Sequence, residues 1–172
     1  MNINKIIDYA KTFIGIPYTW WTGMETNDVF NCDNIPDLDS LKLNGINCAG
    51  FINILIQYSG KSIPKSFVQS IPRGGTGFWL IYFIKNRVLK KIDYKQKYAI
   101  GTLLFRTYNN IDDQGHLAII VENSKLNSKI IHAYAEEYGG QVGISDMITD
   151  NTPKNYYEFI VYPKDWLNLS NQ

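Results

Sequence analysis

Cysteine and histidine are both scarce in this chain, which has only two of each among its 172 residues. The two cysteines, Cys32 and Cys48, lie 16 positions apart. One disulfide between them is possible, but a framework of several disulfides is not indicated. The fold must therefore be stabilised mainly by a hydrophobic core.

An excess of charge of either sign is also missing. Lysine and arginine total 17 and aspartate and glutamate total 16, so the net charge is +1. A broad basic surface for nucleic acid or acidic lipid is not implied by this balance. The sequence therefore predicts no nucleic-acid partner.

Long hydrophobic runs are absent as well. The longest, Phe78 to Ile84, is far shorter than the roughly 20 residues that span a bilayer. Asp8 and Lys11 interrupt the apolar residues near the amino terminus, so a secretory signal is not expected. We expect a soluble protein, cytoplasmic by default, that forms one domain over residues 1–172.

Helical spacing of apolar residues marks the first half of the chain, and strand-like runs mark the second. A long polar loop is predicted at about residues 22–46, either flanking the functional site or decorating the surface. Periodicity does not separate helix from strand at 78–86, where we favour a helix. The order of elements predicts an α+β domain with N-terminal helices packed on a central antiparallel sheet. Helices are expected at 6–14, 48–59 and 78–86, strands at 99–105, 116–121, 129–134, 140–144 and 157–161, and a helical turn at 165–169.

Cys48 is the candidate nucleophile because it falls at the predicted start of a helix. Asn47 is a suitable N-cap, Gly60 a natural stop, and the apolar residues between them predict one buried face. The amino terminus of a helix carries about half a positive charge, which favours a thiolate. The thiolate is the reactive form of cysteine.

His116 and His132 fall in the two strands of one predicted hairpin. Side chains on a strand alternate between faces, so two even-numbered positions share a face in any even register. With a loop centred near residues 125–126, position 118 pairs with 132, and the two histidines become diagonal neighbours. Packing the Cys48 face of the helix on this sheet would bring all three side chains together.

This set of residues suits nucleophilic catalysis. His116 can take the thiol proton as a general base and return it to a leaving amine. His132 can fix the tautomer and orientation of His116. The backbone N–H of Cys48 can face a developing oxyanion, with the Tyr18 hydroxyl as a second donor.

Five segments together resemble the NlpC-type papain-like cysteine peptidases, whose members mostly cut peptide stems of the bacterial cell wall. Gly15–Trp20 resembles the family's Gly-x-Pro-Tyr-x-Trp segment, and Asn47–Phe51 its Asp-Cys-Ser-Gly-Phe nucleophile motif. Ile100–Phe105, Gly115–Ile119 and Ile131–Ala133 resemble its Gly-Asp-Leu-Val-Phe, His-Val-Gly-Ile and Ile-His-Ala strands. The resemblance extends from about Ile6 to Val161 and implies a papain-like (NlpC-type) fold.

The resemblance implies roles for individual residues. Cys48 would be the nucleophile, His116 the base and His132 the orienting residue. Tyr18 would lie near the substrate, and with Trp20 and Asn47 it completes the expected substrate and oxyanion region. No cofactor and no metal are required by this chemistry.

Two departures from the family motif bear on the substrate. Asn47 stands where the motif has Asp, and Ala49 stands where it has Ser. A preference for acidic cell-wall stems therefore does not follow. The substrate is expected to be a peptide or amide, with acyl transfer or deacylation on the same fold as the alternative to hydrolysis.

Two further classes of function compete with catalysis. Cys48, His116 and His132 could bind zinc together with Cys32 or Asp33, although no CxxC or HxxxH spacing is present. A catalytically inactive module that binds peptide is the other class. The sequence does not indicate the oligomeric state.

Overall fold

The computed structural model describes residues 2–20, 31–65, 70–110, 114–123, 127–135, 140–148 and 156–168. In these ranges the helices are α1 (Ile3–Lys11), α2 (Leu38–Asn44), α3 (Cys48–Tyr58), α4 (Thr76–Lys85) and α5 (Pro163–Trp166). The strands are β1 (Lys90–Lys91), β2 (Leu103–Arg106), β3 (His116–Asn123), β4 (Ser128–Ala133), β5 (Val142–Asp146) and β6 (Phe159–Val161).

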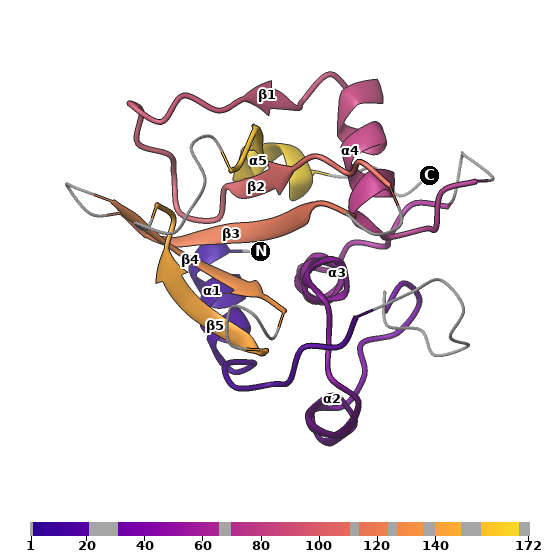
Figure 1. Ribbon diagram of the computed structural model, residues 1–172. Coiled ribbons are helices and arrows are strands. Elements are labelled where there is room, and N and C mark those ends of the chain that lie inside the picture. Colours follow the sequence, from indigo (N-terminus) through magenta and orange to yellow (C-terminus); the bar gives the residue numbers. More distant parts are fainter. Residues whose placement is uncertain are drawn as a thin grey trace.

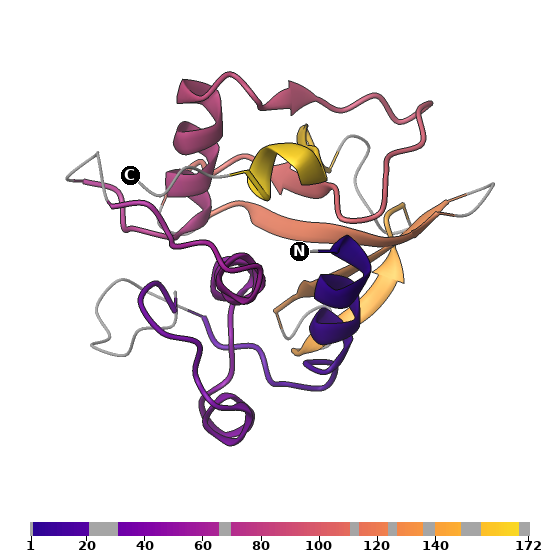
Figure 2. The same cartoon turned by 180° about the vertical axis from the view of Figure 1, so that it is seen from behind.

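The six described strands form one antiparallel sheet in the order β1-β6-β2-β3-β4-β5 (Figure 1). Seen from behind, α1, α3 and α5 cover one face of this sheet (Figure 2). The predicted α+β class, with helices packed on an antiparallel sheet, is therefore confirmed. Within the described part of the chain, no helix combines the length and hydrophobicity needed to cross a membrane.

Side chains at odd and even positions of β3 pack into separate cores on the two faces of the sheet. Leu117 and Ile119 of β3 pack with the helices in the larger core. Ala118 and Ile120 of the same strand pack on the other face, in a smaller core with Tyr157. The period of two along a strand explains this division.

Helix α3 is buried on all sides, not on one face as the sequence predicted. Asn47 caps it as expected, since its Oδ1 accepts a hydrogen bond from the Gly50 N–H at 2.7 Å. Every residue from Cys48 to Ile56 is buried. A helix that is hydrophobic all round is stable only in a protein interior, and the sheet, α1 and the neighbouring segments enclose this one.

The predicted loop at residues 22–46 contains a helix, so that prediction is wrong for its second half. Asp37 accepts a hydrogen bond from the Ser40 N–H at 2.9 Å and caps α2, and Leu41 buries its side chain. This local capping outweighs the polar composition of the segment. Residues 22–30 lie outside the described part of the chain.

Other predicted elements differ from the structure mainly in their ends. Helix α4 confirms the helix predicted at 78–86. The strand predicted at 99–105 begins only at Leu103, because the chain turns at Gly101, where φ is +86°. That conformation suits glycine and interrupts an extended strand.

Gly115 holds the turn immediately before His116, and we expect Gly115→Ala to destabilise the fold. Its φ is +76°, and an added Cβ would collide with the Arg106 carbonyl oxygen and lie 2.8 Å from the Thr107 carbonyl group. The left-handed conformation alone costs roughly 1–2 kcal/mol for alanine, and the collision with backbone atoms adds to it. Urea unfolding measures the loss.

Gly60→Ala is the matched control for this prediction. Gly60 has a similar φ of +85°, but an added Cβ there would meet no atom within 4 Å. The difference between the two variants isolates the backbone collision. Equal losses of unfolding free energy would contradict the prediction.

Candidate active site

Cys48 is the first residue of α3, and its sulfur meets the beginning of β3. The residue is 7% exposed. The Leu117 N–H donates a hydrogen bond to Sγ, and the Thr76 Oγ1 at the start of α4 lies 4.0 Å from Sγ. The sulfur of the predicted nucleophile is therefore hydrogen-bonded to Leu117, the residue that follows the predicted base, His116, in β3.

The surroundings of Cys48 oppose the thiolate that a helix start favours. Burial raises the pKa of the thiol, because a desolvated anion is unfavourable. Hydrogen bonds from Leu117, Thr76 and Ala49 and the charge of Arg106 lower the pKa but only partly offset burial. The resting group is a neutral thiol that needs a base at the moment of attack.

The two histidines form a hydrogen-bonded pair, as the predicted hairpin register requires. Ile119 pairs with Ile131 and Ile120 with Ile130, which is the register with position 118 opposite 132. His116 Nε2 lies 2.7 Å from His132 Nδ1, and the ring centroids are 5.0 Å apart. The predicted placement of both rings on one face is confirmed.

The face that carries the histidines is not the face that α3 covers. Leu117 points into the helical core, so His116 points to the opposite side, where its ring centroid is 6.2 Å from that of Tyr157. The sequence had predicted that the Cys48 helix packs on the histidine face. Instead, the two residues approach each other at the beginnings of their elements. Cys48 is the first residue of α3 and His116 is the first residue of β3.

The connection between thiol and imidazole is indirect in this resting state. Of the hydrogen bonds among the described residues, none joins Cys48 Sγ to either ring, and none uses His116 Nδ1. The His116–His132 bond occupies Nε2 and leaves Nδ1 as the nitrogen available to a proton from the thiol. Catalytic hydrogen bonds are often long in unliganded sites and shorten when substrate binds.

Both rings are neutral at neutral pH. Burial lowers the pKa of His116 well below its ordinary value, and the nearby His132 and Arg106 lower it further. Burial also lowers the pKa of His132, to about 4. The resting site thus combines a neutral thiol with two neutral imidazoles, which is suited to general-base catalysis.

These lowered values predict that the protein loses stability as the pH falls from about 6.5 to 4. His132 has a pKa of about 4 when folded and an ordinary value of 6.5. Between these values the unfolded chain binds more protons, so the stabilisation is complete above pH 6.5 and lost towards pH 4. The His132 contribution is on the order of 3 kcal/mol, and His116 adds in the same direction.

Urea unfolding of the wild type and of the double variant His116→Gln/His132→Gln, at pH 7 and pH 4.5, measures this effect. The carboxylates titrate alike in both proteins, so the difference between them reports the imidazoles. A difference in unfolding free energy that does not change between the two pH values would contradict the prediction.

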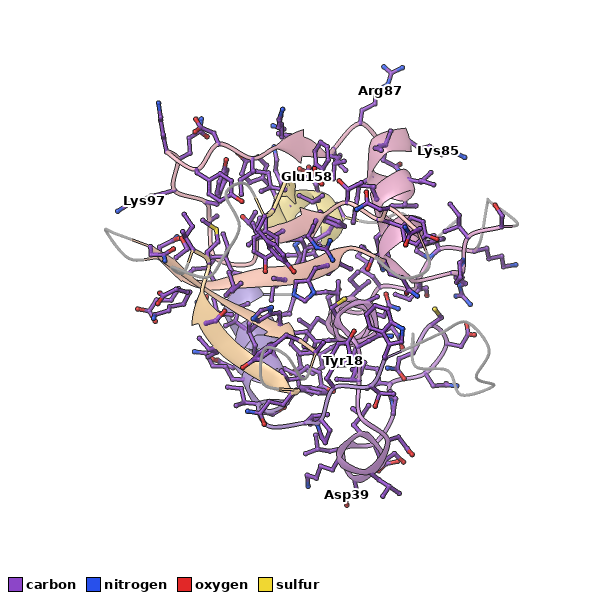
Figure 3. All side chains as sticks on the ribbon, viewed as in Figure 1. Tyr18, Asp39, Lys85, Arg87, Lys97 and Glu158 are labelled. Carbon is purple, nitrogen blue, oxygen red and sulfur yellow. The ribbon has the colours of Figure 1, made fainter. Side chains whose placement is uncertain are left out.

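Tyr18, Trp20 and Asn47 line one pocket together with Cys48. Trp20 is 44% exposed at its rim, and Tyr18 lies near the middle of the molecule in the view of Figure 3. Backbone bonding fixes this wall, since the Tyr18 N–H donates to the Gly140 carbonyl at 2.6 Å and Tyr18 pairs with Ile46. The residues predicted to form the substrate and oxyanion region therefore share one pocket with Cys48.

The rest of the pocket comes from residues that were not predicted to line it. Thr76, Gln114 and Gly115 complete the lining with Ala49. Thr76 was missed because the predicted helix began two residues too late. The Gly74–Gly75 pair directly before Thr76 was the available signal for the helix start.

Cys32 takes part in a separate buried network and does not join Cys48. Its Sγ donates to the Arg73 carbonyl at 3.2 Å, and Asn53 Nδ2 lies 3.9 Å from it. Asn53 also donates to the Gly74 carbonyl at 3.0 Å and accepts from Trp79 Nε1 at 2.7 Å. This network ties α3 to α4, and both cysteines are free thiols.

The zinc alternative gains no support from the arrangement of side chains. In the ranges that the structure describes, no group of three or more His, Cys, Asp or Glu side chains could hold a metal ion. Asp33, one of the proposed ligands, is paired with Arg73 at 2.6 Å.

Comparisons with known proteins give a weak likeness to solved structures. No protein-family model matches the chain, and no curated protein matches it. A solved structure described as similar to lipoprotein, NLP/P60 family, from Staphylococcus aureus subsp. aureus Mu50 aligns with a TM-score of 0.47 and 17% sequence identity. The alignment covers 86% of this chain and 37% of that one, so this chain spans little more than a third of its length.

Proposed function

We propose that this protein is a cysteine hydrolase with an NlpC-type, papain-like active site, which cleaves an amide bond through a thioester. The observation that carries the proposal is the meeting of two elements. Cys48 begins a capped helix, and its sulfur accepts a hydrogen bond from the amide next to His116, whose ring is held by His132. The sequence motifs around these residues agree with the same assignment.

Acylation begins with removal of the thiol proton. His116 Nδ1 takes the proton from Sγ as the sulfur attacks the carbonyl carbon of the substrate. The resulting imidazolium is stabilised by donating its Nε2–H to His132 Nδ1. It then gives its Nδ1 proton to the leaving amine, and a thioester on Cys48 remains.

Deacylation repeats the proton transfers with water. His116 removes a proton from the water that attacks the thioester carbonyl, and Sγ leaves and regains a proton. In both tetrahedral intermediates the backbone N–H of Cys48 faces the oxyanion, with the Tyr18 hydroxyl as the second donor. The buried setting of Cys48 strengthens these dipoles, because little water screens them.

The pocket limits the group that the enzyme accepts. It is small, with a volume of about 20 Å³, which is room for little more than one water-sized group. The described lining contains no charged side chain, and Asn47 and Ala49 take the places of the more polar residues of the motif. We propose a peptide substrate of the cell-wall stem type or a related peptide, with an uncharged side chain next to the cleaved bond.

Mass spectrometry of products tests the proposal. The protein is incubated with cell-wall fragments and with a panel of acyl-peptides, and Cys48→Ala serves as the blank. New amine and acid termini that form only with the wild type support hydrolysis. Transfer of the acyl group to an added amine, with no free acid, would show acyl transfer in place of hydrolysis. If no member of the panel is turned over, the result would count against the proposal that the protein is an enzyme.

A further inference from the structure

The hydrogen-bond chain from His116 continues past His132 to a third side chain. His132 Nε2 lies 3.1 Å from the Oγ of Ser145, on the neighbouring strand β5. Ser145 in turn donates to the backbone carbonyl of Asp146 at 3.3 Å. The three polar side chains come from adjacent strands, so the sheet sets their spacing.

Strand registers place all three side chains in one row on the same face. In β4 and β5, Ile130 pairs with Ser145 and His132 with Gly143, so Ser145 and His132 are diagonal neighbours. Gly143 carries no side chain, and the Tyr134 hydroxyl occupies the space above it. The His132 ring is thereby flanked by Tyr134, with centroids 4.6 Å apart, and its Nε2 faces Ser145.

The direction of this chain follows from its last member. A carbonyl oxygen only accepts, so the single hydroxyl proton of Ser145 is used on Asp146. The hydroxyl oxygen must then accept from His132 Nε2–H. A neutral imidazole has one N–H, which leaves His132 Nδ1 as an acceptor for His116 Nε2–H, and leaves His116 Nδ1 with a lone pair.

We infer that Ser145 is a positioning residue that sets the tautomers of both histidines so that the basic nitrogen of His116 is the one available to Cys48. This inference rests on the proposed function for its purpose, but the tautomers themselves do not depend on activity. The lowered pKa of both histidines agrees with it, because neutral rings have a tautomer to be set. Without Ser145 the N–H of His132 can move to Nδ1, and the chain then reverses.

Long-range ¹H–¹⁵N correlation spectra at pH 7 test the inference directly. The chain contains only two histidines, so the spectra of His116→Gln and His132→Gln assign every ring nitrogen. For the wild type we expect the proton on Nε2 and a bare Nδ1 in both rings. In Ser145→Ala a protonated Nδ1 should appear in His132, and Ser145→Thr, which keeps the hydroxyl, should restore the wild-type pattern.

Ser128→Ala is the matched control, because it removes another strand serine, whose hydroxyl donates a hydrogen bond to Asn123 Oδ1. It should leave the imidazole signals unchanged. A protonated Nδ1 in either wild-type ring, or identical spectra for the wild type and Ser145→Ala, would overturn the inference.

Kinetics add a second measurement if the enzyme turns over a substrate from the panel. Ser145→Ala should lower kcat by about 2- to 10-fold, the range for one neutral hydrogen bond, with KM unchanged. A change in KM alone would contradict a positioning role. Absence of turnover in the wild type would refute the proposed function and leave the spectroscopic result standing.

Discussion

Replacing Cys48 by alanine should abolish turnover while the protein stays folded. The sulfur is the only group in the proposed mechanism that bonds covalently to substrate, and alanine cannot replace it. The fold should survive, because the hydrogen bonds of the thiol are weak and the change removes a single atom. Product formation by mass spectrometry and thermal unfolding measure the two expectations.

Cys32→Ser is the matched control for this variant. It removes the other free thiol but keeps a donor to the Arg73 carbonyl. Turnover should remain near the wild-type rate. Wild-type activity in Cys48→Ala would refute the mechanism. Loss of activity in Cys32→Ser but not in Cys48→Ala would show that Cys32, and not Cys48, is the nucleophile.

The state of the thiol gives this prediction a pH dependence. Burial raises the pKa of Cys48, so alkylation by iodoacetamide should be slow at pH 6 and accelerate above about pH 8.5, the ordinary value for a thiol. Substrate turnover at neutral pH would then depend on His116 removing the proton during attack. Fast alkylation at pH 6 would instead indicate a thiolate that is already formed.

Replacing His116 by alanine should be nearly as damaging. General acid–base catalysis typically contributes about 10²- to 10⁴-fold, and His116 serves in both halves of the proposed reaction. His132→Ala should cost less, because an orienting group can be replaced in part by water. The measurement is kcat/KM for each variant on the same substrate.

His132→Ala also serves as the control for general damage to the pair. Both variants break the 2.7 Å hydrogen bond between the rings, so any difference in their rates reports the separate roles of the two histidines. A larger loss in His132→Ala than in His116→Ala would exchange the assignments of base and orienting residue.

The sequence predicted the histidine pair well because strand geometry leaves little freedom. Two even positions in a hairpin share a face unless the register slips by one residue. The bulge between Ile120 and Glu122 makes such a shift on the loop side, and beyond it Ile119 pairs with Ile131, the even register that puts both histidines on one face. The cap at Asn47 was predictable for a similar reason, since it depends on neighbouring residues only. Local rules of this kind can be read from sequence.

Features that depend on tertiary surroundings were not predictable. A stripe of apolar residues shows that α3 is buried, but not that the histidines occupy the opposite face of the sheet from the helix. The pKa of Cys48 rises because the thiol is desolvated, and a sequence shows a helix start without showing its exposure. Ser145 was missed because the predicted strand ended at residue 144, one position before it.

The complete enclosure of α3 has a consequence for how the protein inactivates. An element with no exposed face cannot fray into solvent on its own, so its opening requires disruption of the larger core. The nucleophile therefore belongs to the part of the molecule that opens last. Heating should remove catalytic competence and tertiary structure in a single cooperative step, with no folded but inactive species before it.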